Sequence, residues 1–220
     1  MDLFPLWNSL RISAIATMAA LVIGIVAAYL VMKMPRTLKG LCDCLLTIPM
    51  VLPPTVVGYF ILVSLSPKSV IGGKLQEWFS ITITMRWYGA VIAVTIIAFP
   101  FIYRTTRGAF EDMDPNLLDA GRTLGLSEWY IFRKILLPNA KQGIVAGTIL
   151  AFARGIGEYG ATSMVSGYIA GKTATVSTSV AYFWQINQEQ AAAYWVMINL
   201  VISFVFMLVM NVLLRKKVRG

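Results

Sequence analysis

The chain has 220 residues, of which 58% are apolar and only 13% are charged, so we expect a membrane protein and not soluble domains. The net charge of +9 comes from basic residues that lie between apolar runs, which indicates membrane topology and predicts no nucleic-acid partner. The sequence contains no histidine and only 2 cysteines, which excludes imidazole relays, Ser-His triads and closed zinc sites. We therefore expect no catalytic residue, no metal site and no cofactor.

Five apolar segments approach the length of about 20 helical residues that crosses a bilayer core of about 30 Å. They are residues 12–32, 45–65, 87–110, 143–165 and 191–214. The predicted fold is all-α and polytopic, with residues 1–220 forming a single transmembrane domain in the lipid bilayer.

The second apolar segment contains three prolines, in the run TIPMVLPPTVVG. Each proline lacks an N–H donor and must distort a helix, so Pro49, Pro53 and Pro54 predict a break in this span. A break in lipid survives only where protein or water covers the freed carbonyls. We therefore expect Pro53 and Pro54 to face a neighbour or a translocation pathway and not lipid.

Basic residues are distributed unequally between the two sets of connections. One set carries four, namely Lys68, Lys74, Arg86 and Lys172. The other set carries thirteen: Lys33, Arg36, Lys39, Arg104, Arg107, Arg122, Arg133, Lys134, Lys141, Arg215, Lys216, Lys217 and Arg219. Because the basic side of a membrane protein is cytoplasmic, the N-terminus is predicted outside and the C-terminus inside.

The connection between the third and fourth spans, residues 114–138, is the longest polar stretch on the inner side. Asp114 followed by Pro115 predicts a helix start, and Gly125 predicts its end in the left-handed conformation. Ser127 predicts the cap of a second helix, and Pro138 marks the start of the next span. A helix, a sharp glycine turn and a second helix are expected on the inner membrane surface.

The spacing of apolar residues gives each of these two helices one face. The first carries a small, weakly apolar stripe: Leu117, Ala120, Gly121 and Leu124. On the second, Trp129, Phe132 and Leu136 share a face. A connector resting in the headgroups would need larger anchors on the first helix. Small side chains favour close docking against another protein.

The same connection resembles the EAA---G---------I-LP signature of permease subunits of ABC importers. The matching residues are Asp119-Ala120-Gly121, Gly125 and Ile135-Leu136-Leu137-Pro138, with Asp119 where Glu is usual and Gly121 where Ala is usual. In that family the segment is the coupling helix that sits in a groove of the cytoplasmic ATPase. The resemblance implies these ATPase-coupling residues: Asp119, Ala120, Gly121, Arg122, Leu124, Gly125, Ile135, Leu137 and Pro138.

The resemblance covers nearly the whole chain. The stretches IPMVLPPTVVGY, AFARGIGEYGAT and GYIAGKTATVSTSVAY are similar to permeases for tetrahedral oxyanions, closest to the molybdate branch. It implies a type I importer fold, a homodimer, two cytoplasmic ATPase subunits and an external oxyanion-binding protein. Tungstate, or sulfate and thiosulfate, remain alternative substrates, because selectivity in this class resides in the binding protein.

The fourth span contains a possible ion pair and a line of small residues. Arg154 and Glu158 are four residues apart on one helix face, where they can pair. A pair that fixes helix packing is favoured over an anion site, since tight binding in a channel would slow release. Gly147 and Gly155 belong to a small-residue line that lets helices approach closely and that lines the predicted pathway.

The run SGYIAGKT, residues 166–173, ends like a phosphate-binding loop, yet the first position of that motif is serine. It also lies on the predicted outer side, where no ATP is available, so it is interpreted as a polar external turn. A second class of function, an ion-coupled secondary carrier, would need Arg154 and Glu158 as its coupling site. Five spans that do not divide into two inverted halves argue against it.

Overall fold

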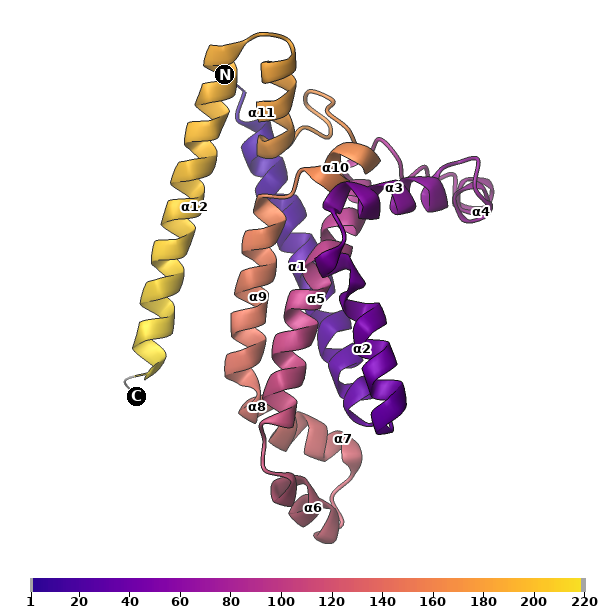
Figure 1. Ribbon diagram of the computed structural model, residues 1–220, viewed down its shortest axis with the longest axis vertical. Helices are drawn as coiled ribbons and strands as arrows, with labels where there is room; N and C mark the ends of the chain where they lie inside the picture. The colour runs from indigo at the N-terminus through magenta and orange to yellow at the C-terminus, as the bar shows by residue number, and fades with distance from the viewer. Residues whose placement is uncertain (1, 219–220) are drawn as a thin grey trace.

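The computed structural model describes the backbone of residues 2–218 and the side chains of residues 2–208, and within that part of the chain all regular structure is helical. The molecule is elongated (Figure 1), with the N-terminus and α11 (Val176–Gln185) at one end and α6 (Pro115–Thr123) at the other. Arg219, one of the basic residues counted on the inner side, lies outside the described residues.

Three helices form the centre of the molecule: α1 (Phe4–Met32), α5 (Trp87–Glu111) and α9 (Lys141–Ile156). Their contacts are made largely by alanines with no exposed surface: Ala16, Ala20, Ala28, Ala90, Ala93, Ala98 and Ala151. In lipid, where apolar surface gives no drive to associate, such small residues let helices pack closely enough for van der Waals attraction to hold them.

Glycines bring α9 and α5 still closer together. A Cβ added at Gly147 would lie 2.0 Å from Thr105 Oγ1 and 3.0 Å from the Ile102 Cα atom. At Gly143 the same atom would lie 2.6 Å from the Ala109 Cβ atom. Gly147, predicted as a packing residue, therefore lies at a backbone-to-backbone contact inside one chain.

The predicted second span is two helices, α2 (Arg36–Val51) and α3 (Pro54–Leu65), bent by 106°. The sequence predicted a distorted span over residues 45–65, and the structure has this distortion as a complete break between two helices. Residues that precede proline are driven to extended backbone, and Leu52 (ψ 144°) and Pro53 (ψ 133°) both precede one. Two extended residues in succession turn the chain, and α3 with α4 (Val70–Phe79) projects sideways as an arm (Figure 1).

The predicted fourth span is also interrupted. Helix α9 ends at Ile156, and the short α10 (Gly160–Val165) follows after a turn, so residues 143–165 are not one helix. Among the described residues, three helices are long and apolar enough to cross a membrane, α1, α5 and the segment Glu189–Leu208, and the number rises to 5 if each bent helix pair is one span. The second such pair joins Glu128–Asn139 to α9 at 69°.

The last helix, α12 (Glu189–Val218), includes the predicted fifth span and stands at one side of the molecule (Figure 1). It packs mainly on α11 and touches α9 lightly, with the Phe152 and Phe206 ring centroids 5.2 Å apart. Many of its described apolar side chains are exposed, for example Phe204 at 65%. This surface suits lipid or another membrane subunit.

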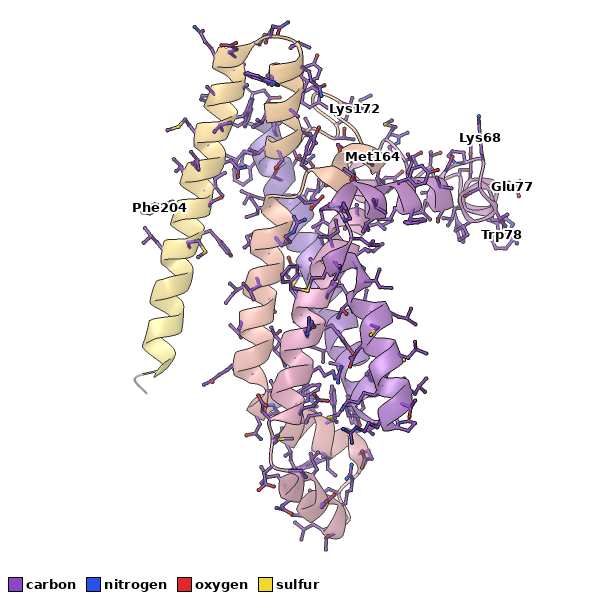
Figure 2. The ribbon with its side chains drawn as sticks, viewed as in Figure 1. Lys68, Glu77, Trp78, Met164, Lys172 and Phe204 are labelled. Carbon is purple, nitrogen blue, oxygen red and sulfur yellow. The ribbon has the colours of Figure 1, made fainter. Side chains whose placement is uncertain are left out.

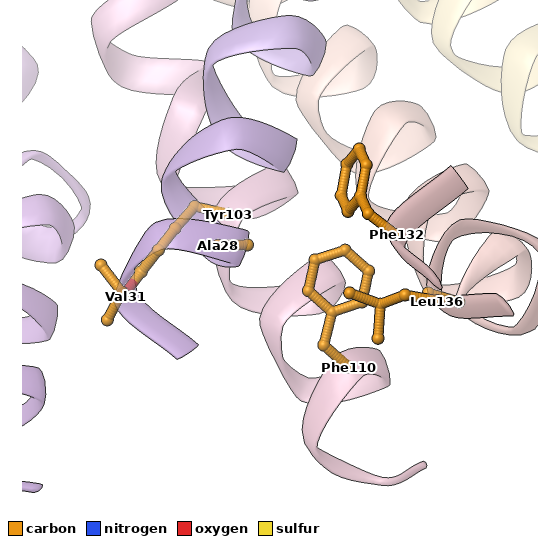
Figure 3. Packing of buried hydrophobic residues seen from close by; sticks show 7 residues of the cluster. Ala28, Val31, Tyr103, Phe110, Phe132 and Leu136 are labelled. Carbon is orange, nitrogen blue, oxygen red and sulfur yellow. The ribbon is translucent and has the colours of Figure 1, made fainter. Parts of the chain in front are cut away.

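A compact apolar cluster joins the C-terminal ends of α1 and α5 to the segment that follows α6. Figure 3 shows Ala28 and Val31 of α1, Tyr103 and Phe110 of α5, and Phe132 and Leu136 grouped together. Leu136 is 1% exposed and Phe132 8%. The predicted coupling segment is therefore anchored in the transmembrane core and does not hang from it as a loose loop.

Candidate functional site

Helix α6 begins and ends at the residues that the sequence predicts. The Asp114 side chain accepts a hydrogen bond from the Asn116 N–H at 2.9 Å, which satisfies a donor that the first turn leaves free. At the other end Gly125 has φ +74°, and the Leu126 and Gly125 N–H groups donate to the Gly121 and Arg122 carbonyls. This pair of bonds is the Schellman arrangement. Local chemistry thus fixes the length of α6, the predicted coupling helix.

The helix after the turn is capped as predicted but is not a uniform α-helix. The Ser127 Oγ accepts from the Tyr130 N–H at 3.2 Å and starts α7 (Glu128–Ile131). The chain continues as a π-helical turn, η1 (Phe132–Leu136), and as α8 (Leu137–Asn139). Pro138 lacks an N–H, so the ordinary helical bond to the Lys134 carbonyl cannot form, which explains the wider turn before it.

Gly121 has a different role from the other members of its predicted stripe. It is buried, and a Cβ there would lie 3.2 Å from Ile131 and 3.3 Å from Ile135. Leu117 and Leu124 are 47% and 77% exposed, and Ala120 is exposed too. Gly121 therefore brings α6 against α7 within the chain, while its neighbours form the free surface.

Trp129 also differs from its predicted partners on the second helix. Its ring centroid lies 5.6 Å from that of Phe132, yet 66% of Trp129 remains exposed, whereas Phe132 and Leu136 are buried. The end of the molecule that carries α6 thus presents exposed apolar side chains from both helices: Leu117, Leu124 and Trp129. A free apolar surface on a polar segment is typical of a protein interaction site.

A chain of ion pairs connects this end to α1. Lys33 Nζ, directly after α1, lies 2.8 Å from Glu128 Oε2, and Arg122 Nε lies 2.9 Å from Glu128 Oε1. Arg122 Nη1 also lies 2.8 Å from Asp119 Oδ1. Lys33 and Glu128 were not predicted as partners, because they are 95 positions apart and no local spacing marks such a pair.

Hydrogen bonds from Arg122 and then Lys33 lower the pKa of Glu128 from 4.5 to about 2. A lowered folded-state pKa means that the pair stabilises the folded state above pH 4.5 and loses this effect as pH falls toward 2. We expect the position of α6 on α7 to be unchanged between pH 8 and pH 5.5. Since Glu128 and Lys33 are 48% and 39% exposed, Glu128→Gln should destabilise by less than about 1 kcal/mol. The midpoint of thermal unfolding, measured between pH 8 and pH 5.5 for the unmodified protein and for Glu128→Gln, checks both expectations through their effect on stability. A midpoint that shifts sharply near pH 6 would contradict the assignment of the low pKa to Glu128.

The second group of predicted site residues surrounds the break after α9. Glu158 has no exposed side-chain surface, and its Oε2 lies 2.6 Å from Arg154 Nη1, so the predicted ion pair is present. Glu158 Oε1 accepts from the Ala161 N–H at 2.8 Å and caps α10. The two residues pair across the end of α9 and not along a continuous helix as predicted.

The two helix breaks in the chain meet each other. A Cβ at Gly160 would lie 3.0 Å from Pro54, and one at Gly58 would lie 2.6 Å from the Ala161 Cα atom. Gly155, on the other side, faces Val94 of α5 at 3.0 Å. The breaks at residues 52–54 and 157–160 therefore cover each other's backbone, as non-helical segments at membrane depth require. Of the residues predicted as one group, Pro54 and Glu158 lie at this junction, whereas Gly155 packs against α5.

Relatives of known description match nearly the whole chain. The molybdenum transport system permease protein ModB of Escherichia coli (strain K12) is 39% identical over 216 residues, which cover 96% of this chain and 94% of that protein. ModB of Haemophilus influenzae is 33% identical over 94% of this chain and 91% of its own length. The sulfate transport system permease protein CysT of E. coli is 30% identical over 87% of this chain and 69% of its own length. These relatives confirm the prediction of a transport subunit and not an enzyme.

Solved structures share the fold at low sequence identity. The MetNI methionine ABC transporter in inward-facing conformations matches with a TM-score of 0.73 and 16% identity, over 96% of this chain and 94% of that one. The bacterial alginate ABC transporter matches with a TM-score of 0.77 over 97% of this chain and 78% of that one. The family of binding-protein-dependent transport system inner membrane components matches residues 20–219. With nine-tenths of its length matched and relatives at 30–39% identity, the chain belongs to this family of inner membrane components.

Proposed function

We propose that this chain is the permease subunit of an ATP-driven importer for a tetrahedral oxyanion, and that the oxyanion is molybdate. The observation that carries the proposal is the 39% identity to a molybdenum permease across 96% of the chain. The capped α6 and the exposed apolar surface at its end support the ATPase-coupling part of the proposal. Sulfate is the second candidate, because CysT of E. coli is 30% identical to the chain.

The proposed assembly is a homodimer with two cytoplasmic ATPase subunits and one external oxyanion-binding protein. In the proposed orientation α6 lies in the cytoplasm and the N-terminus outside, in agreement with the excess of basic residues near α6. A membrane-impermeant thiol reagent applied outside should label Lys172→Cys and leave the exposed native Cys44 unlabelled. If the reagent labels Cys44 before residue 172, the proposed orientation is wrong and the opposite one holds.

In this proposal ATP binding closes the ATPase pair and moves α6 with it. Because α6 is held on α7, and the segment after α7 is packed into the cluster of Figure 3, the movement reaches α1 and α5 directly. The pathway then switches from inward-open to outward-open, a population shift driven by a ligand on another subunit. The coupling residues around Asp119 and Gly125 act mechanically and carry no chemistry.

The decisive experiment is uptake of radiolabelled molybdate into proteoliposomes that contain the chain, its ATPase and its binding protein. We expect uptake that requires ATP, survives collapse of the proton gradient and is not competed by a hundredfold excess of sulfate. Competition by sulfate would favour the second candidate. Uptake that requires the proton gradient and not ATP would support the ion-coupled carrier and overturn the proposal.

Leu124→Asp is expected to lower ATP-dependent uptake about tenfold or more. Leu124 is 77% exposed, so the substitution leaves the core intact but places a charge in the proposed ATPase interface, where losing an apolar contact costs about 1–2 kcal/mol. Asn116→Asp, an exposed position on the same helix, introduces the same charge and serves as the control. Co-purification of the ATPase subunit checks the cause. Equal uptake by the two variants would contradict the assigned docking surface.

A further inference from the structure

A basic cavity of about 310 Å³ lies at the end of the molecule opposite α6. Three cations line it, Arg11 from α1, Arg86 at the N-cap of α5 and Lys172 from the loop between α10 and α11. None of its lining residues is acidic. Three positive side chains from segments far apart in the sequence therefore converge on one small space.

Hydrogen bonds between distant segments hold the walls of this cavity in place. The Asn8 Nδ2 donates to the Ala174 carbonyl at 3.0 Å, and the Ser9 Oγ accepts from the Val176 N–H at 2.9 Å. Asn8 and Ser9 are only 3% and 4% exposed. These buried bonds fix the loop of Lys172 to the first turns of α1, close to Arg11 in the sequence.

The loop itself, which includes the phosphate-loop-like run SGYIAGKT, has a defined shape. Gly167 and Gly171 adopt φ +60° and +68°, conformations that suit glycine. The Thr173 Oγ1 accepts from the Ile169 N–H at 2.9 Å, and Thr173 is 1% exposed. Figure 2 shows Lys172 on this loop. The ordered turn places Lys172 in the wall of the cavity.

The three cations of the cavity have no acidic partner among the described residues. The ion pairs of that part of the chain involve other residues, at the inner end and at Glu158. The guanidinium carbon of Arg11 lies 3.5 Å from the centroid of the Trp87 ring. This cation–π contact positions Arg11 but leaves its charge uncompensated.

A cavity at the inner end shows the opposite arrangement. It has a volume of about 420 Å³ and is lined by Arg107 together with Asp43 and Glu111. Arg107 pairs with Asp43, and its Nε lies 3.2 Å from Glu111 Oε1. Arg107 is therefore paired with acidic groups in this cavity, although Arg104, which also lines it, is not. The outer cavity differs in that its lining contains cations and no acidic residue.

We propose that the outer cavity is a low-affinity site for a small tetrahedral oxyanion, which receives the anion before it enters the pathway. The inference rests on the proposed function for its orientation and substrate class. Clefts lined by one sign of charge raise the local concentration of the opposite ion. A cavity of about 310 Å³ has room for a small oxyanion with part of its hydration shell. Exposed cations bind weakly, as a transfer site requires.

Equilibrium binding of radiolabelled molybdate to the transporter, assembled with its ATPase in lipid nanodiscs without the binding protein, tests the site. Lys172→Gln and Arg86→Gln should each raise the Kd about fivefold, and raising salt from 50 to 500 mM should weaken binding by screening. Lys68→Gln is the matched control, since it removes the same charge from the arm at a position remote from Lys172 (Figure 2). Its Kd should equal that of the unmodified transporter.

Two results would overturn the site. The first is a Kd that is the same for Lys172→Gln, Arg86→Gln and Lys68→Gln, or no saturable binding at all. The second is an unchanged Kd with a raised apparent KM for the loaded binding protein, which would make the cavity a docking surface. Failure of the proposed function looks different: molybdate would bind in a Lys172-dependent way, yet the reconstituted importer would not take it up.

Discussion

Replacing Gly147 with leucine is expected to prevent the chain from assembling as a stable membrane protein. A first side-chain carbon at Gly147 already lies 2.0 Å from Thr105 Oγ1 and 3.0 Å from the Ile102 Cα atom. The threonine side chain can rotate away, but the α5 backbone cannot yield without separating α5 from α9. Overpacking typically costs about 1–3 kcal/mol, and a branched side chain against backbone lies at or above the upper end of that range.

The yield of monodisperse protein in mild detergent and the midpoint of thermal unfolding measure this effect. Gly147→Ala should give an intermediate result, because only one carbon meets α5. Gly108→Leu is the matched control, since Gly108 is also in a transmembrane helix and nothing lies within 4 Å of its added Cβ atom. If Gly147→Leu and Gly108→Leu unfold at the same temperature, the close packing of α5 and α9 is not what holds the molecule together.

The sequence predicts best those features whose cause is local. Asp114, Gly125 and Ser127 define α6 and α7 through groups within a few residues of each other, and the structure places each of them at its predicted helix end. The long apolar helices α1 and α5 follow from length and composition in the same way.

Features that depend on distant residues were not predictable in this way. The prolines mark where the second span breaks, but the angle of 106° depends on α3 packing against α10, which no local pattern reveals. The break after Ile156 has no proline at all, and it exists because Glu158 caps α10 while Gly160 admits Pro54. The sequence places Gly121 in a stripe predicted to dock against another protein. Its contact with Ile131 in the structure shows that it packs within the chain instead.

The grouping of positive charge in the outer cavity was likewise not predictable from the sequence. Arg11, Arg86 and Lys172 are separate basic residues in the sequence, and Arg11 lies within the first turns of a helix that otherwise faces lipid and protein. Their convergence depends on Asn8 and Ser9, whose buried bonds to the outer loop span more than 160 positions. Composition predicts how much positive charge there is, whereas the fold decides where it is left unpaired.

The second large effect on stability is expected at the junction of the two helix breaks. The stability of this junction should depend on Glu158 more than on Arg154. Glu158→Ala removes the cap of α10 and leaves Arg154 without its partner, since Glu158 Oε1 binds the Ala161 N–H and Oε2 pairs with Arg154. Breaking a buried pair costs about 3–5 kcal/mol. Because Arg154 is 31% exposed, the charge left behind contributes at the lower end of that range, and the lost bond to the Ala161 N–H adds to it. Much of the purified variant should therefore be unfolded or aggregated.

Arg154→Gln should be milder in its effect on assembly, because the Arg154 side chain is 31% exposed and its amide replacement can still donate to Glu158. The double variant Arg154→Gln with Glu158→Gln should recover much of the stability that Glu158→Ala loses, since it buries no unpaired charge and keeps a group able to cap α10. Thermal unfolding of the unmodified protein, Arg154→Gln, Glu158→Gln and the double variant gives the coupling energy. Flux decides the role of the pair: if Arg154→Gln assembles, binds its ATPase and hydrolyses ATP normally but imports no oxyanion, Arg154 acts on the anion itself. In that case the pair does more than hold the two breaks together.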